Sequence, residues 1–404
     1  MAINWKKLKK QAIGLWRKPK IRWAVLGGSV ALVAAVIAVV VLFGGEESKP
    51  LITDGDTSSI TLVLGGDLNV TDNTVASGGS EYDYTTPFLD VAQIFAQADA
   101  SLLNFEGNFC GQPYGSATRS APQAMAETLA AMGVDFLQMA NSCSIKNGMD
   151  GLSQTLNAIR NASMEPLGAY ASNSEFAQQQ GFTLRSICGI KVAFVAFTKG
   201  MDGMGLPTGS ENCVNLLYTD YTSTYKKINT DGITNILQAV EKAQPDITIA
   251  LVHWGSEENT SISSSQKKIA DLMLENGVDA IIGTHSHQLQ SINYDEENGT
   301  VVAYSLGDFY GDGTTSGNQY SLLLQLEITK NWDTGAAQIT ALDHIPIYTL
   351  TESREQEPMR IVQIKPALEA YEKNHISKVS ETAYKNMKAA LEQIEKKIAP
   401  LEDQ

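Results

Sequence analysis

Short apolar runs alternate with amphipathic stretches along most of the chain. Nine runs rich in aliphatic and aromatic residues predict strands, at 60–67, 101–107, 134–141, 191–198, 247–255, 279–285, 301–309, 320–328 and 339–347. Stretches with helical spacing of apolar positions predict helices at 87–97, 122–132, 151–161, 229–243 and 263–276. This alternation, with almost continuously apolar strands, indicates an α/β fold with buried sheets. The later strands have no long helices between them, which predicts that part of the sheet is antiparallel.

The first 43 residues follow a different pattern. Residues 24–43 are twenty uncharged and mostly apolar residues, enough to span roughly 30 Å of hydrocarbon as a helix. The first 22 residues carry eight Lys or Arg and no acid, which predicts a cytoplasmic N-terminus. A cleaved signal peptide is the alternative, but its apolar core is usually about 7–15 residues long. We therefore expect a single-pass protein of the cell membrane with an extracellular C-terminal domain.

These patterns divide the chain into five parts. We expect a basic cytoplasmic segment at 1–23, a transmembrane anchor at 24–43, a linker at 44–58, an α/β domain at 59–350 and a helical appendage at 351–404. The appendage is rich in Glu and Lys and predicts two helices, at 365–374 and 377–397.

The balance of charges narrows the class of partners. The chain has 30 basic and 45 acidic residues, and only 22 of the basic residues follow the predicted anchor. Such an acidic surface repels nucleic acid, so no nucleic-acid partner is expected.

Side chains that bind metals follow five of the predicted strands. They are Asp67, Glu106, His253 with Glu257, His285 with His287, and Asp308. Because ligands bind at the carboxyl ends of strands in open α/β sheets, we expect these side chains to meet. Histidine and carboxylate ligands suit zinc, manganese or iron, and a pair of ions can hold a phosphoryl group. The alternative for His285 and His287 is an exposed strand on which both contact only water.

Five motifs carry a resemblance to a known family. GGDLN (65–69), NFEGN (104–108), HWGSE (253–257), GTHSHQLQ (283–290) and YSLGDF (304–309) resemble, in order and spacing, the motifs of the CapA (PgsA) family of poly-γ-glutamate capsule-biosynthesis proteins. The resemblance covers about residues 60–350. It implies a calcineurin-like metallophosphatase fold, a four-layer α/β/β/α sandwich with mixed sheets. It also implies one or two divalent ions, with Mn, Zn or Fe as candidates.

The resemblance also suggests roles for individual residues. The metal ligands it implies are Asp67, Glu106, Asn141, His253, His285 and His287, and the catalytic candidates are Glu257 and Asp308. Asp308 stands where the family usually has Asn. Further site positions are Asn69, Asn104 and Gln290.

One loop departs from the family pattern. The family typically reads A-N-N-H-x-x-D-x-G where this chain reads ANSCSIKNG at 140–148. Ser142 replaces an Asn expected to bind metal, Cys143 a His that assists the phosphoryl group, and Lys146 an Asp. Loss of a proton-transfer group typically lowers a rate by about 10²–10⁴, so the resemblance implies a site of uncertain competence.

Cys143 has three readings from the sequence. It forms a disulfide with Cys110, it is a buried free thiol, or it is a thiolate metal ligand.

Three functions are open at this point. The first is a CapA-like role in biosynthesis or export of a capsule or cell-surface polymer. The second is an active metal-dependent phosphoesterase or amide hydrolase acting on envelope components. The third is a non-catalytic binding or scaffold module of a polymer-synthesis or export complex. An anionic cell-surface polymer is a candidate ligand, and it would need a metal bridge or local cations such as Lys146 and Arg119.

Overall fold

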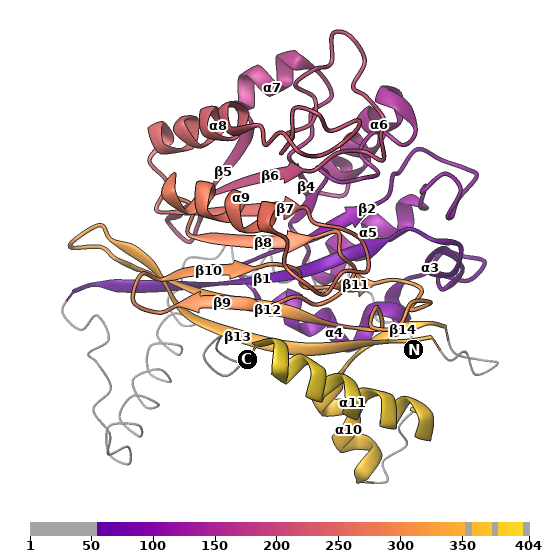
Figure 1. The fold of residues 1–404 in the computed structure, drawn as a ribbon. Helices are drawn as coiled ribbons and strands as arrows, with labels where there is room; N and C mark the ends of the chain where they lie inside the picture. The colour runs from indigo at the N-terminus through magenta and orange to yellow at the C-terminus, as the bar shows by residue number, and fades with distance from the viewer. Residues whose placement is uncertain (1–54, 352–357, 374–378, 399–404) are drawn as a thin grey trace, which may run out of the picture. The chain divides into compact units, whose positions relative to one another are not determined.

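The chain divides into two compact units, Met1–Asp56 and Thr57–Gln404. The structure, a computed structural model, describes residues 55–351, 358–373 and 379–398, so the first unit lies almost wholly outside it. All the helices and strands discussed below belong to the second unit (Figure 1).

The prediction of a single-pass membrane protein is corrected at this point. Within the described part of the chain, no helix has both the length and the apolar character that crossing a bilayer requires. The segment on which that prediction rested, residues 24–43, lies outside the described residues.

The first sheet has eight strands and is mixed, as the sequence predicted. Its order is β14-β13-β12-β1-β2-β3-β4, with β11 paired to β1. Neighbours among β1 to β4 are parallel, whereas β12, β13 and β14 are antiparallel to their neighbours. The strands are β1 Thr57–Asn69, β2 Ala100–Glu106, β3 Phe136–Gln138, β4 Glu165–Leu167, β11 Asp308–Tyr310, β12 Tyr320–Asn331, β13 Ala337–Leu350 and β14 Arg360–Gln363.

The second sheet has six strands in the order β5-β6-β7-β8-β10-β9. Its four central strands are parallel, and β5 and β9 run antiparallel at the two edges. The strands are β5 Phe182–Ile187, β6 Ile190–Thr198, β7 Ile247–His253, β8 Ala280–Thr284, β9 Ile292–Asp295 and β10 Thr300–Ala303.

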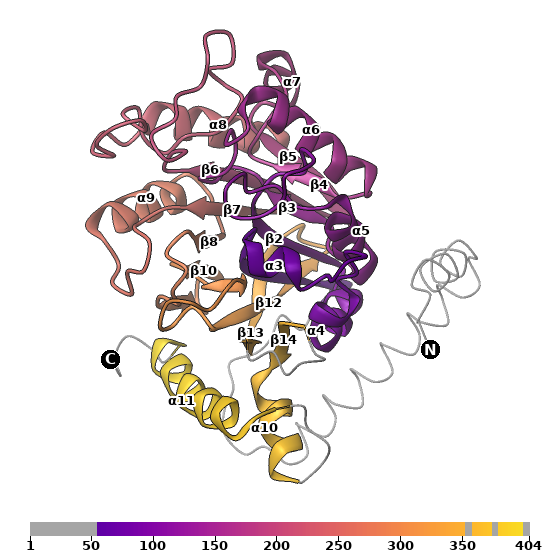
Figure 2. The same ribbon diagram turned by 90° about the vertical axis from the view of Figure 1, so that its right-hand side faces the viewer.

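The two sheets lie between two groups of helices (Figure 2). Alternate residues of β6 show how the layers divide. Val192 and Phe194 belong to the buried cluster that includes the first sheet, whereas Ala193 and Val195 belong to the cluster that includes α8 and α9. The ring of Phe194 lies 4.6 Å from that of Phe136 on β3, which joins the sheets. The helices are α3 Asp72–Ala76, α4 Thr85–Gln97, α5 Gln123–Met132, α6 Gly148–Asn161, α7 Asn173–Gln179, α8 Thr230–Ala243, α9 Ser264–Glu275, α10 Ile364–Glu372 and α11 Glu381–Ile398.

Four aspartates tie the starts of the parallel strands together. Each directly precedes a strand, donates its N–H to a neighbouring strand's carbonyl, and accepts the N–H of that same residue with its carboxylate. The pairs are Asp99 with Thr61, Asp135 with Ser101, Asp246 with Lys191 and Asp279 with Thr248. These bonds satisfy backbone groups of β1, β2, β6 and β7 one residue before each parallel ladder begins.

The two helices predicted near the C-terminus are present as α10 and α11. They pack on each other through the stacked rings of Tyr371 and Tyr384, whose centroids are 4.4 Å apart. Met387 and Ile394 of α11 are fully buried. The strand β14, which precedes α10 and extends the first sheet, was not predicted.

Candidate metal centre

Polar side chains at the carboxyl ends of strands from both sheets meet in one cluster. Its members are Asp67 and Asn69 of β1, Asn104 and Glu106 of β2, Asp308 of β11, His253 of β7, and His285 and His287 of the loop after β8. All are buried except His287, which is 14% exposed. The arrangement brings together the ligand types that the sequence placed at separate strand ends.

Asp67, His287 and Asp308 form the first group, with donor atoms within 4.8 Å of one another. Asp67 and Asp308 are paired in register on the parallel strands β1 and β11. Gly66 permits this approach, because a Cβ there would lie 1.8 Å from the Gly307 carbonyl oxygen. Nδ1 of His287 lies 2.8 Å from Asp308 Oδ1 and 3.5 Å from Asp67 Oδ2.

Burial and neighbouring charges shift the pKa values of all three residues of the first group. Burial raises the pKa of Asp67 to about 8, against the opposing charge of His287. Burial likewise raises the pKa of Asp308, and His287 again opposes the shift. Burial alone would lower the pKa of His287, but the charge and hydrogen bond of Asp308 raise it well above its ordinary value. The two carboxylates therefore resist carrying full charge together unless a cation lies among them.

Glu106, His253 and His285 form the second group, again within 4.8 Å of one another. Nε2 of His253 lies 2.9 Å from Glu106 Oε1, and the rings of His253 and His285 are 4.2 Å apart. Burial alone would raise the pKa of Glu106, but the hydrogen bond and charge of His253 hold it well below its ordinary range. Burial and the charge of His253 lower the pKa of His285 well below its ordinary value. The second group therefore offers an ionised carboxylate beside a neutral imidazole.

Thr198, the last residue of β6, orients His253. Its hydroxyl lies 2.9 Å from Nδ1 of His253 and 2.9 Å from the carbonyl oxygen of Gly200. When the hydroxyl donates to Gly200, its oxygen accepts from the Nδ1–H of His253. This contact fixes the orientation of the ring and leaves Nε2 directed at Glu106, where it would serve as the ligand of a bound metal.

Two features of the loop after β8 suit metal binding. His285 and His287 have positive φ angles of 87° and 56°, a conformation that bulky residues rarely adopt and that recurs at functional sites. Nδ1 of His285 is buried and has no hydrogen-bond partner in the described part of the chain. An orphaned imidazole nitrogen among carboxylates and other imidazoles fits a metal ion.

The loop at 140–148 packs against the second group. The hydroxyl of Ser142 donates to Glu106 Oε2 at 3.1 Å. Asn141 uses its amide within the chain: Nδ2 donates to Asn104 Oδ1 at 2.9 Å, and Oδ1 accepts from the N–H of Cys143 at 3.0 Å. Asn104 in turn donates to Asp67 Oδ1 at 2.5 Å. Asn141 therefore orients Asn104, which reaches the first group.

The structure selects one of the three readings of Cys143. None of the four cysteines forms a disulfide, so the reading that paired Cys143 with Cys110 is excluded. Cys143 is 2% exposed, and burial raises its pKa to about 12. It belongs to none of the candidate ligand groups found among the described residues. Cys143 is thus a buried, protonated thiol.

Three other predicted positions lie outside the cluster. Glu257 is exposed, although a carboxylate oxygen comes within 4.8 Å of donor atoms on His285 and His287. Gln290 is buried but bonds to Gln266 at 2.9 Å rather than to the cluster. Lys146 is exposed on its loop.

Two residues of the site escaped the sequence reading. Thr198 ends the strand predicted at 191–198 and Lys199 follows it directly, so the strand-end rule pointed to both, but neither is a usual metal ligand. Lys199 lines a hollow of about 250 Å³ together with His253, His285 and Glu257.

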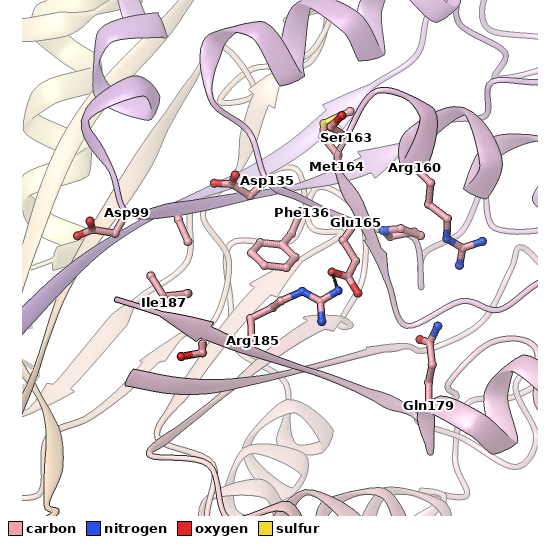
Figure 3. Close-up of a pocket in the computed structure, with 13 residues that line it drawn as sticks. Asp99, Asp135, Phe136, Arg160, Ser163, Met164, Glu165, Gln179, Arg185 and Ile187 are labelled. Carbon is pink, nitrogen blue, oxygen red and sulfur yellow. Dashed lines mark hydrogen bonds and ion pairs between the residues drawn. The ribbon is translucent and has the colours of Figure 1, made fainter. Parts of the chain in front are cut away.

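A second hollow, of about 500 Å³, lies at the opposite ends of β2 and β3 (Figure 3). Its charged groups are already engaged. Arg185 pairs with Glu165, and Arg160 pairs with Glu175. Asp99 and Asp135 accept strand N–H groups. Its side chains are therefore accounted for by the fold.

Solved structures offer distant likenesses. The calcineurin-like phosphoesterase YfkN from Bacillus subtilis aligns with 72% of this chain and 91% of its own, at 15% identity and a TM-score of 0.45. The 5'-nucleotidase from Candida albicans SC5314 aligns with 83% of this chain and 57% of its own, at 13% identity and a TM-score of 0.42. Because these TM-scores are low, we argue the chemistry of the site only from the residues of this chain.

Two capsule proteins are similar in sequence. The PGA biosynthesis protein CapA of Bacillus subtilis (strain 168) is 27% identical over 261 residues, which are 63% of this chain and 64% of that protein. The capsule biosynthesis protein CapA of Bacillus anthracis is 25% identical over 260 residues, 64% of this chain and 56% of that protein. The match thus spans less than two thirds of either relative.

A family model covers the part of the chain that holds the cluster. Residues 61–313 match the model described as bacterial capsule synthesis protein PGA_cap. The match includes β1, β2, β7, β8 and β11, the strands whose ends carry the ligand groups. It takes in more than half of the sequence, and the chain therefore belongs to the PGA_cap family of bacterial capsule synthesis proteins.

Proposed function

We propose that the cluster is a divalent metal centre with a metallophosphatase-like arrangement, and that the chain uses it in biosynthesis or export of a capsule polymer. The observation that carries the metal centre is the convergence of two ligand groups, Asp67/His287/Asp308 and Glu106/His253/His285, each within 4.8 Å. The orphaned Nδ1 of His285 supports it. The donor types suit Mn, Zn or Fe, as one ion or as two.

In this proposal the side chains of the centre have three roles: binding the metal, orienting its ligands and accepting a proton. Six side chains would hold the metal, and Asn69, Asn104 and Asn141 would orient them through their amides. Bound metal would polarise an oxygen of the substrate and lower the pKa of a bound water. Glu257, exposed beside His285 and His287, is placed to accept a proton from that water or from the substrate.

We infer the class of polymer from the family. The relatives named above are capsule biosynthesis proteins, one of them for PGA, which supports an anionic, poly-γ-glutamate-like polymer as the ligand. A polymer-synthesis or export complex is the expected partner. Because the chain is acidic, with a net charge of −15, polymer binding would depend on the metal and would be abolished by a chelator.

A second candidate function is binding without turnover. The loop at 140–148 favours this function. Ser142, Cys143 and Lys146 stand where the family resemblance expects a metal-binding Asn, a proton-transferring His and an Asp. Cys143 is protonated and buried and is a poor substitute for a proton-transferring His. In this case the metal centre would hold the polymer or a synthesis intermediate.

Metal analysis of the full-length chain tests the centre. We expect one or two equivalents of a divalent ion after dialysis, and loss of that ion in His285→Ala and Glu106→Gln. Exposed Glu392 provides the matched control, because Glu392→Gln removes one carboxylate from α11, which contributes no residue to the cluster. A wild-type chain that retains no ion at micromolar Mn, Zn or Fe would sink the proposal.

A further inference from the structure

The hollow beside the second ligand group is lined in part by a lysine, although the chain as a whole is acidic. It encloses about 250 Å³ and is lined by Lys199, Asp202, Tyr225, His253, Glu257 and His285 among others. Two of these side chains, His253 and His285, belong to the proposed metal centre. A group bound in the hollow would therefore contact Lys199 and the metal centre at once.

Lys199 is held in place by three contacts. Its backbone N–H donates to the carbonyl oxygen of His253 at 2.8 Å. Its Nζ donates to the carbonyl oxygen of Gly255 at 2.7 Å, and lies 4.7 Å from the centre of the Tyr225 ring. An ammonium group has three N–H donors, and this is the one hydrogen bond that Nζ makes within the described part of the chain. The lysine is thus oriented and still has donors to offer.

The charges around Lys199 are arranged by depth. Lys199 is half-buried, whereas Asp202 and Glu257 are exposed at the rim. Burial lowers the pKa of Lys199, and the charges of Glu257 and Asp202 oppose that shift. Lys199 is therefore the more buried of the three charged groups, and the low local dielectric there strengthens its contact with an anion bound in the hollow.

We propose that Lys199 binds an oxyanion of the substrate, a carboxylate or a phosphate group, in the hollow beside the proposed metal centre. The proposal rests on the proposed function, because the same oxyanion would contact the metal ligated by Glu106, His253 and His285. It supplies the local cation that an anionic polymer needs, for which the sequence offered only Lys146 and Arg119. Of these, Lys146 is exposed, and the guanidinium of Arg119 donates to the carbonyl oxygen of Val70 at 3.1 Å.

The alternative is that Lys199 only fastens the loop at Gly255. Lys330 is a matched control, since its ammonium also lies over an aromatic ring, 4.6 Å from Trp332, and makes one ion pair, at 2.7 Å to Asp246. Lys199→Met and Lys330→Met keep the apolar stem and remove the charge. Lys199→Arg keeps the charge.

The experiment is calorimetric titration of the full-length, metal-loaded chain with inorganic phosphate and, separately, with γ-glutamylglutamate. We expect Lys199→Met to weaken binding of the preferred probe by about 10-fold to 100-fold, with Lys330→Met unchanged and Lys199→Arg partly restored. Tighter binding of phosphate would assign the hollow to a phosphoryl group, and tighter binding of the dipeptide would assign it to a carboxylate. Equal affinity in Lys199→Met and wild type would overturn the proposal, even if the variant melts at a lower temperature.

Metal content is measured on the same samples. An unchanged metal content in Lys199→Met together with lost oxyanion binding supports the proposal. A wild-type chain without metal would mark failure of the proposed centre instead. In that case the metal-free chain is titrated, because Lys199 lines the hollow with or without metal. Weaker binding in Lys199→Met than in wild type supports the proposal, and equal binding, or none in either protein, overturns it.

Discussion

Glu106 and His253 lie 147 positions apart and on different sheets, yet Nε2 of His253 is 2.9 Å from Oε1 of Glu106. The contact joins the two sheets at the carboxyl ends of β2 and β7. Both partners are fully or almost fully buried, so their geometry depends on the groups behind them. Ser142 fixes the other oxygen of Glu106, and Thr198 fixes the other nitrogen of His253.

Thr198→Val should weaken metal binding without unfolding the chain. Valine has the shape of threonine but cannot accept from Nδ1 of His253, so the ring loses its fixed tautomer and orientation. We expect metal affinity to fall by about 10-fold to 100-fold, as for other outer partners of ligating histidines. Calorimetric titration with Mn²⁺ or Zn²⁺ measures it.

Thr284 provides the control for that variant. It is also buried at the end of a strand of the second sheet, but its hydroxyl has no hydrogen-bond partner among the described residues. Thr284→Val should leave metal affinity unchanged. Equal affinities in Thr198→Val and wild type would mean that the hydroxyl does not position His253.

Asp279→Asn should stabilise the fold more at neutral than at acidic pH. Burial raises the pKa of Asp279 to about 6, against the bond it accepts from Thr248 N–H. The folded pKa thus exceeds the unfolded value of about 4, so the ionised group lowers stability above pH 6, and that loss fades as the pH falls from 6 to 4. Asparagine keeps an oxygen for Thr248 and removes the charge.

Urea denaturation at pH 7.5 and pH 5 measures this effect. We expect the gain in free energy of unfolding to be about 1 kcal/mol larger at pH 7.5 than at pH 5. Glu392→Gln is the control, because it removes one exposed negative charge and shows how far net charge alone changes the free energy of unfolding. A gain of the same size at both pH values would show that desolvation of Asp279 is not its source.

Cys143 should resist alkylation in the folded chain. With a pKa of about 12, roughly one thiol in ten thousand is ionised at pH 8, and only the thiolate reacts. Cys188 is exposed and serves as the internal standard. Peptide mass spectrometry after iodoacetamide treatment should show Cys188 modified first and Cys143 modified only on unfolding. Protection of Cys143 that disappears on reduction, without unfolding, would instead indicate a disulfide.

Sequence patterns located most of the strands, and the strand ends that carry the ligand types, because both depend on local order. An apolar run that ends in GGD or GTHSH places its polar residue at the end of a strand, and strand ends of one sheet share an edge. Thr198 was missed for a different reason: its role is to orient His253, which lies 55 positions away, and no pattern near Thr198 records that partner.

Several elements that the sequence did not predict are short or depend on distant pairing. β4 has three residues and β14 has four, too few for a period to be recognised. β14 exists because it pairs with β13 in the folded chain. Likewise, the state of Cys143 was open until its burial was known, since spacing alone does not separate a thiol from a disulfide.

Restoring the family residues in the loop tests whether the centre can turn over a substrate. Ser142 contacts the second ligand group, with its Oγ 3.1 Å from Glu106, and Cys143 lies behind it, with Sγ 3.6 Å from the same Oγ. We expect Ser142→Asn with Cys143→His to raise hydrolysis of bis(p-nitrophenyl) phosphate in Mn²⁺ by about 10²–10⁴ over wild type, since the imidazole supplies proton transfer. The larger side chains enter a buried loop, and overpacking typically costs about 1–3 kcal/mol, so melting temperature and metal content are followed alongside. Adding His253→Ala must remove the gain, which separates the centre from a contaminating phosphatase. A folded, metal-loaded double variant without hydrolysis would show that more than the loop limits turnover, and would favour binding without catalysis as the role of the centre.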